Sequence, residues 1–386
     1  MNKLYLHTFF SFLVSIILLL GGIKNSYSQN SNQSKELFKK GIKALYSYNF
    51  TEVNLIKNTL INEFPNSSDS YFLAANYHWW RIITGEDQIK LSDSCHFNLD
   101  KAISLMPTKN NTGMDNVQLF QLISLYAFKA RVELLNKNHL KTFRYLNKII
   151  DLLKLSFERE NEYDSFNLTS GLYNFLSEYA KKEKPLISPL LRFFPKGGMI
   201  KGISQLKSIH QSPDELLSAE ANYFLTKIYL EAVPDYKEAL HHAEFLTKKY
   251  PSNLLYQYFV FKTYLTNDQA TKAMEQINTL IIYSNSNQNI SVLQKNYYIK
   301  YAYYKLGQFF KKKGNLTQAI YCFNKAAKYS DQKNKVFYKI LLAKANTLDE
   351  FDSELASEVY SKIINESNDH EIKALARKNM SSKNKN

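Results

Sequence analysis

The stretch "AYYKLGQFFKKKGNLTQAIYCFNKAAKY", Ala302–Tyr329, decides the fold. It reads as two helices, because apolar and small side chains recur at helical spacing on both sides of the Gly314-Asn315 turn. Gly307 stands in the middle of the first apolar face, where a glycine costs about 1 kcal/mol relative to alanine. Glycine is favoured there if a second helix approaches closely. The stretch therefore predicts an antiparallel helix pair.

The residues that pack this pair follow a fixed order, an aromatic-x₂-Leu-Gly-x₂-aromatic run and then Ala-x₃-Phe: Tyr303, Leu306, Gly307, Phe310, Ala319, Phe323 and Ala326. This order resembles the tetratricopeptide repeat (TPR) family. The resemblance implies an all-α fold, a TPR-like right-handed superhelical solenoid of antiparallel helix pairs. We expect Asn315 to cap the second helix and Gln318 to close a capping box.

The same helix-start pattern recurs along the chain. Asn49–Val53, Asp235–Ala239 and Asn315–Ala319 all read Asn or Asp, apolar, polar, Glu or Gln, then a small residue. A proline, which ends a helix, stands twelve positions after a small residue in three places, namely Val53 and Pro65, Cys95 and Pro107, and Ala239 and Pro251. These spacings and the helical periodicity predict helix pairs at about 34–67, 69–107, 116–157, 215–251, 254–284, 291–330 and 336–366. His370–Asn379 is expected to be a polar-faced terminal helix.

Residues 1–28 have the layout of a secretory signal peptide. Lys3 precedes an apolar run from Phe9 to Ile23, and Ser26 and Ser28 suit a cleavage site before Gln29. The alternative is an uncleaved anchor, but the apolar run is shorter than the roughly 20 residues of a membrane-spanning helix. No cysteine follows the run, so attachment as a bacterial lipoprotein is not predicted. We expect an exported protein, in the periplasm, associated with the outer membrane or extracellular.

After the signal peptide, we expect residues 29–33 to be disordered, 34–380 to form one TPR-like repeat domain, and 381–386 to be a disordered tail. An atypical insert, 184–202, interrupts the repeats with three prolines and three glycines. Residues 165–210 resemble, in a loose motif, the inclusion-body-clearance family of TPR proteins, and this resemblance implies no residue roles. Leu190, Phe193 and Phe194 of the insert are candidate partner-binding residues. Alternatively they fill the core, which general burial statistics favour.

Charge and composition limit the partners. The chain carries a formal net charge of +15, with six arginines against 44 lysines. Cleavage after Ser28 would remove Lys3 and Lys24 and leave +13. Nucleic-acid binding favours clustered arginines and an intracellular location, so we expect no nucleic-acid partner. Protein or peptide partners, possibly acidic, are expected instead.

No pattern of catalysis or cofactor binding stands out. The chain lacks G-x-S-x-G, Walker A and G-x-G-x-x-G sequences, and adjacent His241 and His242 do not have the i, i+4 spacing of a zinc pair. Cys95 and Cys322 are the two cysteines; one disulfide is possible, but small buried packing residues are favoured. We expect no enzyme, no metal and no cofactor.

The function that follows from this fold is binding. A TPR-like array offers an extended surface for peptides or protein segments, so we expect an exported scaffold or adaptor that mediates protein–protein interaction in the bacterial envelope. The alternative is an envelope glycan- or nutrient-binding protein, because the 28 tyrosines suit stacking on sugar rings. The oligomeric state is left open.

Overall fold

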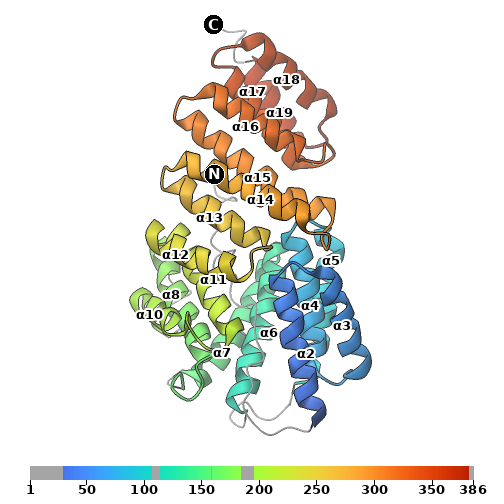
Figure 1. Cartoon of the computed structure of the whole chain (residues 1–386), viewed down its shortest axis with the longest axis vertical. Coiled ribbons are helices and arrows are strands. Elements are labelled where there is room, and N and C mark those ends of the chain that lie inside the picture. Colours follow the sequence, from blue (N-terminus) through green and yellow to red (C-terminus); the bar gives the residue numbers. More distant parts are fainter. Residues whose placement is uncertain (1–28, 107–113, 158, 184–194, 382–386) are drawn as a thin grey trace. The chain divides into compact units, whose positions relative to one another are not determined.

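The computed structural model describes residues 29–106, 114–157, 159–183 and 195–381, and these residues form helices and connections with no strand (Figure 1). They divide into two compact units, Met1–Tyr250 (unit 1) and Pro251–Asn386 (unit 2). The sequence predicted one repeat domain over 34–380 instead.

In unit 1 the described helices are α2 Gln29–Tyr46, α3 Phe50–Glu63, α4 Ser68–Ile83, α5 Gln88–Ser104, α6 Asn116–Leu135, α7 His139–Ser156, α8 Phe166–Glu183, α10 Met199–Ile209, α11 Glu215–Glu231 and α12 Tyr236–Lys249. In unit 2 they are α13 Leu254–Thr266, α14 Ala270–Ser286, α15 Val292–Lys312, α16 Leu316–Lys328, α17 Lys335–Leu348, α18 Ser353–Glu366 and α19 His370–Ser381.

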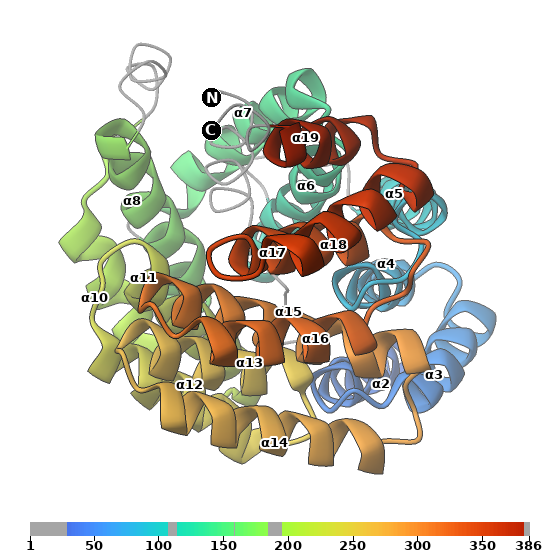
Figure 2. The ribbon, with the colours of Figure 1, turned by 90° about the horizontal axis from the view of Figure 1, so that it is seen from above.

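Consecutive helices pack against each other in pairs, α2 with α3, α4 with α5, and so on to α17 with α18 (Figure 2). Within unit 2 the first helices of neighbouring pairs also contact each other, α13 with α15 and α15 with α17. Seven pairs have the boundaries predicted from the sequence to within a few residues. The predicted all-α, TPR-like architecture of helix pairs is confirmed.

Four of the turns inside helix pairs share one geometry. The residue before the second helix's N-cap has a positive φ at Tyr48, Lys137, Asp268 and Gly314. The N–H of the next residue then bonds to a carbonyl five residues back, as from Asn315 N to Phe310 O at 2.9 Å and from Asn138 N to Glu133 O at 2.8 Å. This is the Schellman arrangement that ends a helix. The C-terminal cap of one helix is thus joined directly to the N-cap of its partner.

The predicted helix starts are present. The side chains of Asn49, Asp235 and Asn315 accept hydrogen bonds from the first-turn N–H groups of α3, α12 and α16. At Asn315 the bond comes from Gln318 N at 3.1 Å, and the reciprocal bond of the predicted capping box is not formed. The complete capping box lies at the start of α15, between Ser291 and Gln294.

Gly307 lies where α15 and α16 approach each other. A Cβ atom added there would lie 2.7 Å from Cε1 of Phe323, which is a fully buried ring on α16. Ala319 and Ala326 are also buried between the helices. The close approach requires glycine, so alanine at this position would force the Phe323 ring to move.

The largest difference from the sequence reading lies in 166–209. The sequence patterns predicted no helix pair in these residues. In the structure, α8 and α10 form one of the most extensively packed pairs of the described chain. A Cβ at Gly202 would lie 2.5 Å from Gly171 O, and one at Gly197 would lie 2.1 Å from Ser177 Oγ. Tyr173 Oη donates to Pro195 O at 2.7 Å. The glycines of the predicted insert therefore allow two backbones to touch, and Met199–Gly202 belong to α10.

The ends of the described chain are helical. Helix α2 begins at Gln29, so residues 29–33, predicted to be disordered, extend it by more than a turn. Helix α19 packs Ile372 and Ala376 against the core of α17 and α18, as expected of a terminal capping helix, and it ends at Ser381. The predicted signal peptide, residues 1–28, lies outside the described residues and stays a prediction. Among the helices that are described, none is both long and apolar enough to cross a membrane.

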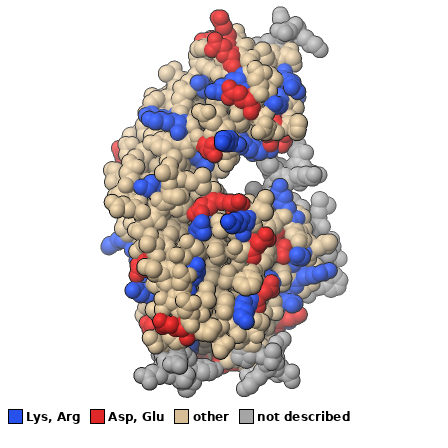
Figure 3. Space-filling model, turned by 90° about the vertical axis from the view of Figure 1, so that its right-hand side faces the viewer, with Lys and Arg blue, Asp and Glu red and all other residues tan. Residues whose placement is uncertain are grey.

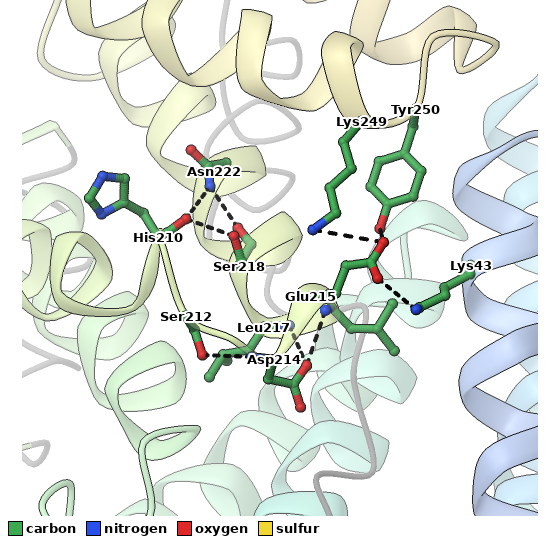
Figure 4. Close-up of polar contacts among 11 residues, drawn as sticks. Lys43, His210, Ser212, Asp214, Glu215, Leu217, Ser218, Asn222, Lys249 and Tyr250 are labelled. Carbon is green, nitrogen blue, oxygen red and sulfur yellow. Dashed lines mark hydrogen bonds and ion pairs between the residues drawn. The ribbon is translucent and has the colours of Figure 1, made fainter.

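Unit 1 also differs from a linear array, in which each repeat contacts only its neighbours. Its first helix, α2, contacts α11. Glu215 Oε2 pairs with Lys43 Nζ at 2.6 Å, while Glu215 Oε1 accepts from Tyr250 Oη at 3.2 Å (Figure 4). Tyr46 Oη also donates to Glu220 in the buried interior. These contacts join the first and fifth helix pairs of unit 1 directly.

Candidate functional site

The structure places most of the predicted repeat-packing residues in the interior. Tyr303, Leu306, Gly307, Ala319, Phe323 and Ala326 are buried, and Phe310 is half-buried. They hold α15 against α16 and present no binding chemistry. The candidate partner-binding residues Leu190, Phe193 and Phe194 lie outside the described residues, so their role stays a prediction.

Both cysteines are free and buried, as the packing interpretation predicted. Burial raises the pKa of the Cys322 thiol to about 12 and that of Cys95 as well. Neither thiol is therefore ionised at neutral pH, and neither is a reactive nucleophile.

Three histidines of unit 1 lie close together. His242 forms ring contacts with His210 and His241, and its Nδ1 lies 2.8 Å from Asn222 Oδ1. Asn222 donates through its amide nitrogen to His210 O and Ser218 O, which fixes its orientation (Figure 4). Burial lowers the pKa of His242 to about 3, so the ring is neutral. Across the described residues no group of three His, Cys, Asp or Glu side chains is placed to hold a metal ion.

Charge is distributed unevenly along the chain. Residues 29–250 contain 28 basic and 24 acidic residues, a near balance. Residues 251–348, which form α13 to α17, contain 14 lysines, no arginine and three acidic residues. Most of the excess positive charge of the chain therefore belongs to this part of unit 2.

In unit 1 the basic side chains have acidic neighbours. Ion pairs join Lys43 to Glu215 at 2.6 Å, Lys181 to Glu178 at 2.6 Å and Lys207 to Glu238 at 2.5 Å. On the face drawn in Figure 3, basic and acidic residues are interspersed and form no large patch of one sign. Such pairs neutralise the field of the lysines locally.

In unit 2 lysines and tyrosines share one surface of neighbouring first helices. We call it the lysine–tyrosine surface and define it by Tyr258 and Lys262 of α13 and Tyr297, Lys300, Tyr301 and Lys305 of α15. Tyr258 and Lys262 lie four positions apart on α13, and Tyr297, Tyr301 and Lys305 follow one another at the same spacing on α15, so each set shares a helix face, whereas Lys300 is adjacent to Tyr301 in the chain. Across the two helices, the Tyr258 ring lies 5.4 Å from that of Tyr298, beside Tyr297.

The lysines of this surface repel one another. Lys262 lowers the pKa of Lys305, together with partial burial. On the next pair, burial and the neighbouring charge of Lys362 lower the pKa of Lys344 on α17. Like charges that lie close together are stabilised by an anion placed between them.

Lys300 is the most unusual member of the surface. The residue has a relative exposure of 8%, while its Nζ atom keeps contact with solvent. Its Nζ lies 5.1 Å from the centre of the Tyr297 ring and 5.4 Å from that of Tyr301. Burial lowers the pKa of Lys300, and the more distant Asp331 opposes this shift only in part.

Comparison with known proteins adds little. No family model matches the chain, and no curated protein matches it either. A search of solved structures returns the crystal structure of the P58(IPK) TPR domain, with 15% sequence identity, over 90% of this chain and 97% of that chain. The TM-score is 0.24, so this match carries no argument about arrangement or function. The helix pairs themselves decide the fold. It is a TPR-like array.

The sequence reading missed the lysine–tyrosine surface because it counted charge over the whole chain. The signal was present in the sequence, as 14 lysines against three acidic residues between positions 251 and 348. The burial of Lys300 could not be read this way, because a lysine on an amphipathic helix ordinarily extends its charge into water.

Proposed function

We propose that this protein is an exported scaffold whose lysine–tyrosine surface binds acidic segments of partner proteins in the bacterial envelope. The single observation that carries the proposal is the excess of 14 lysines over three acidic residues in 251–348, where Lys300 lies over the rings of Tyr297 and Tyr301. A TPR-like array of helix pairs is a frame that commonly binds protein segments, which supports the class of partner. Export rests on the layout of residues 1–28.

The chemistry of the surface favours a peptide over a nucleic acid. Residues 251–348 contain no arginine, which is the preferred residue for bidentate contacts to phosphate. Tyrosine rings add apolar contact area at low cost in side-chain entropy, and they contact the stems of a peptide's acidic side chains. A carboxylate requires only point charges, which lysine supplies.

The proposal is tested with the mature chain and a set of short fluorescent peptides, acetylated and amidated so that only side chains carry charge. One peptide alternates Glu and Ser, a second replaces every Glu by Gln, and a third replaces every Glu by Lys. We expect saturable binding of the Glu peptide alone, measured by fluorescence anisotropy, and weaker binding as salt is raised through about 0.15 M. Equal binding of the Gln peptide, or no binding of the Glu peptide, would reject the proposed function.

The glycan-binding alternative gives a different result in the same assay. A neutral oligosaccharide carries no charge to offset the lysines, so its binding would not depend on salt. Competition of soluble glycans against the Glu peptide, with no effect of salt on the glycan, would favour that alternative.

A further inference from the structure

Four large apolar side chains of unit 1 are exposed on α5 and α7, the second helices of two neighbouring pairs. On α5, Ile89 is 79% exposed and Phe97 is 69% exposed. On α7, Leu140 is 79% exposed and Phe143 is 38% exposed. We call these four residues the apolar tips. Single exposed apolar residues are ordinary, whereas a group of them on one surface marks a site of association.

Contacts around α6 place the two helices beside each other. Both α5 and α7 pack against α6. Nε2 of His96 on α5 and Nζ of Lys141 on α7 lie 3.7 Å and 3.6 Å from the same atom, Oε1 of Glu133. Phe97 follows His96 in the chain, and Leu140 precedes Lys141. The exposed faces of α5 and α7 are therefore neighbours at this end of α6.

The start of α5 also lies against the turn that joins α6 to α7. Ser92 Oγ donates to Asn136 Oδ1 at 3.2 Å, and Gln88 Nε2 donates to Leu135 O at 3.2 Å. Ile89 follows Gln88 directly, so its exposed side chain lies near this turn as well. The apolar tips thus belong to one surface rather than to separate parts of unit 1.

The α6–α7 turn and the first turns of α7 are strongly basic, although unit 1 as a whole is nearly balanced in charge. Residues 134–150 contain four Lys or Arg residues and no Asp or Glu. All four are exposed: Lys137, Lys141, Arg144 and Lys148. Glu133 offsets Lys141, and the other three form no ion pair with the described residues. Helix α5 has two lysines and two aspartates, so it adds no net charge.

Basic and apolar side chains share the outer face of α7. Leu140, Arg144 and Lys148 follow one another four positions apart, and Phe143 lies three positions after Leu140. Apolar groups that project among cations match the boundary of a bilayer with anionic lipids. There the cations contact head-group phosphates while the apolar groups enter the acyl region.

The same chemistry argues against two other occupants. A second copy of the chain would bring its own basic residues of α7 against these, and like charges repel. An acidic protein segment would neutralise the cations but leave the apolar tips in water, because carboxylates do not bury apolar surface. A bilayer supplies both the negative charge and the apolar phase.

We propose that the outer faces of α5 and α7 dock on bilayers that contain anionic lipids. The apolar tips enter the interface, and the four basic residues of 134–150 contact head-group phosphates. The surface belongs to unit 1, whereas the lysine–tyrosine surface belongs to unit 2, so this proposal does not rest on the proposed function. A protein docked in this way would present a peptide-binding array at a membrane.

The test uses the chain from Gln29 onward, which keeps every described residue and removes the apolar run Phe9–Ile23, since that run would itself bind lipid. Flotation is measured with phosphatidylcholine vesicles that contain about one third phosphatidylglycerol, and with phosphatidylcholine vesicles alone. We expect binding to the anionic vesicles only, and weaker binding as salt is raised through about 0.15 M. Equal binding to both vesicles, or binding to neither, would overturn the proposal.

The apolar part is tested with matched pairs of substitutions. Leu140→Ser with Phe143→Ser should reduce binding to anionic vesicles about tenfold or more, because two groups that enter the bilayer are lost. The control is Ile282→Ser with Leu355→Ser in unit 2, whose side chains are 65% and 46% exposed, and it should change binding less than about twofold. All four residues are exposed, so both variants should keep the melting temperature. Equal losses in the two pairs would reject this surface.

The basic part is tested in the same way. Arg144→Gln with Lys148→Gln should weaken binding about fivefold or more and make it less dependent on salt. Lys237→Gln with Lys248→Gln removes the same charge from exposed positions of α12 and should weaken binding less than about twofold. Equal losses would show attraction by net charge alone and would reject the surface.

A fluorescent probe reports insertion directly. Cys95 and Cys322 are buried, so an environment-sensitive thiol probe on Leu140→Cys labels the new position selectively. Its emission should shift to the blue with anionic vesicles, as expected when a group leaves water. The same probe on Ile282→Cys should not shift. A probe at position 140 that does not shift would overturn the proposal.

The other occupants give different results. Sedimentation velocity of the unmutated chain tests self-association, and a dimer that dissociates on Leu140→Ser would assign the surface to a second copy and overturn the proposal. Loss of binding of the alternating Glu–Ser peptide by Leu140→Ser with Phe143→Ser would assign it to an acidic protein segment, with the same consequence. Monomeric protein and unchanged peptide binding, together with loss of vesicle binding, would support the membrane.

Discussion

Units 1 and 2 use the same helix pairs but differ in how their lysines are distributed among acidic residues. In unit 1, basic side chains are paired, and hydrogen bonds to acidic partners raise the pKa of Lys207 and of Lys129. In unit 2, burial lowers the pKa of Lys300, and burial together with a neighbouring lysine lowers that of Lys305 and Lys344, whereas a hydrogen bond to Asp369 raises that of Lys335. The frame that packs the helices is therefore independent of the charge pattern on its surface.

This difference shows where to look for function in a repeat protein. Apolar and small residues between paired helices are needed by every pair, so they report on folding alone. Surface charge contributes little to folding, so its sign and position can match the partner that the surface binds. The part of the chain with the large excess of lysine, residues 251–348, is the one we expect to bind.

The two units also place glycine against different neighbours, and this gives the largest expected effect. Gly202 in unit 1 faces backbone atoms, because an added Cβ would lie 2.5 Å from Gly171 O and 2.6 Å from Phe175 N. Gly202→Ala should destabilise the protein by about 3 kcal/mol, the upper end for overpacking, since neither helix can move without breaking hydrogen bonds. The two tryptophans, Trp79 and Trp80, are both buried in unit 1, so tryptophan fluorescence during urea unfolding measures this change. An unchanged midpoint would contradict the close packing of α8 on α10.

Gly307 in unit 2 faces a side chain, so its replacement should cost less. Gly307→Ala should destabilise by about 1–2 kcal/mol, because the Phe323 ring is displaced but can adjust. The double variant Gly307→Ala with Phe323→Leu should lose less stability than the sum of the single changes, since the smaller side chain makes room. Circular dichroism during urea unfolding provides the measurement. Additive losses would show that the two residues are not in contact.

The turns with a positive φ allow a matched comparison between the two units, with a smaller expected change in stability. Gly314 in unit 2 and Lys137 in unit 1 both have a positive φ, 76° and 60°. An added Cβ at Gly314 meets nothing within 4 Å, so only backbone strain acts when Gly314→Ala is made. We expect Gly314→Ala to destabilise by about 1 kcal/mol and Lys137→Gly to stabilise by slightly less. Changes of the same sign would contradict the shared turn geometry.

The smallest expected effects come from single surface charges. Lys305→Gln should stabilise by about 0.3–0.5 kcal/mol at low salt, because it relieves repulsion from Lys262. Lys181→Gln should destabilise by a similar amount, because it breaks the pair with Glu178 in unit 1. Both effects should fade above about 0.5 M salt, where screening is strong. Thermal unfolding at the two salt concentrations distinguishes the signs, and effects that persist in salt would show a cause other than charge.

The sequence was sufficient to predict the fold where local patterns agree. Asn49, Asp235 and Asn315 were recognised as helix starts because capping depends on residues that are adjacent in the chain. The pair of α8 and α10 was missed because its contact depends on Gly171 and Gly202, which are distant in sequence and belong to no shared pattern. The positive φ values at Tyr48, Lys137 and Asp268 were hidden as well, because these residues are not glycine.

The candidate site was predictable only in part. The excess of lysine over acidic residues between 251 and 348 is visible in the sequence, but the burial of Lys300 between Tyr297 and Tyr301 depends on how α15 is rotated in the packed array. The contact of α2 with α11 in unit 1 was equally hidden, because Lys43 and Glu215 are brought together by the whole array rather than by local sequence.

The most direct test of the central claim compares equal losses of charge in the two units. One variant combines Lys262→Gln and Lys305→Gln on the lysine–tyrosine surface, and its control combines Lys90→Gln and Lys237→Gln, two exposed lysines of unit 1. Both variants lower the net charge by the same amount, so general attraction of an acidic peptide is reduced equally. We expect the unit 2 variant to bind the alternating Glu–Ser peptide about fivefold or more weakly and with a shallower salt dependence, while the control changes less than about twofold. Equal losses in the two variants would contradict the claim that the lysine–tyrosine surface is the binding site.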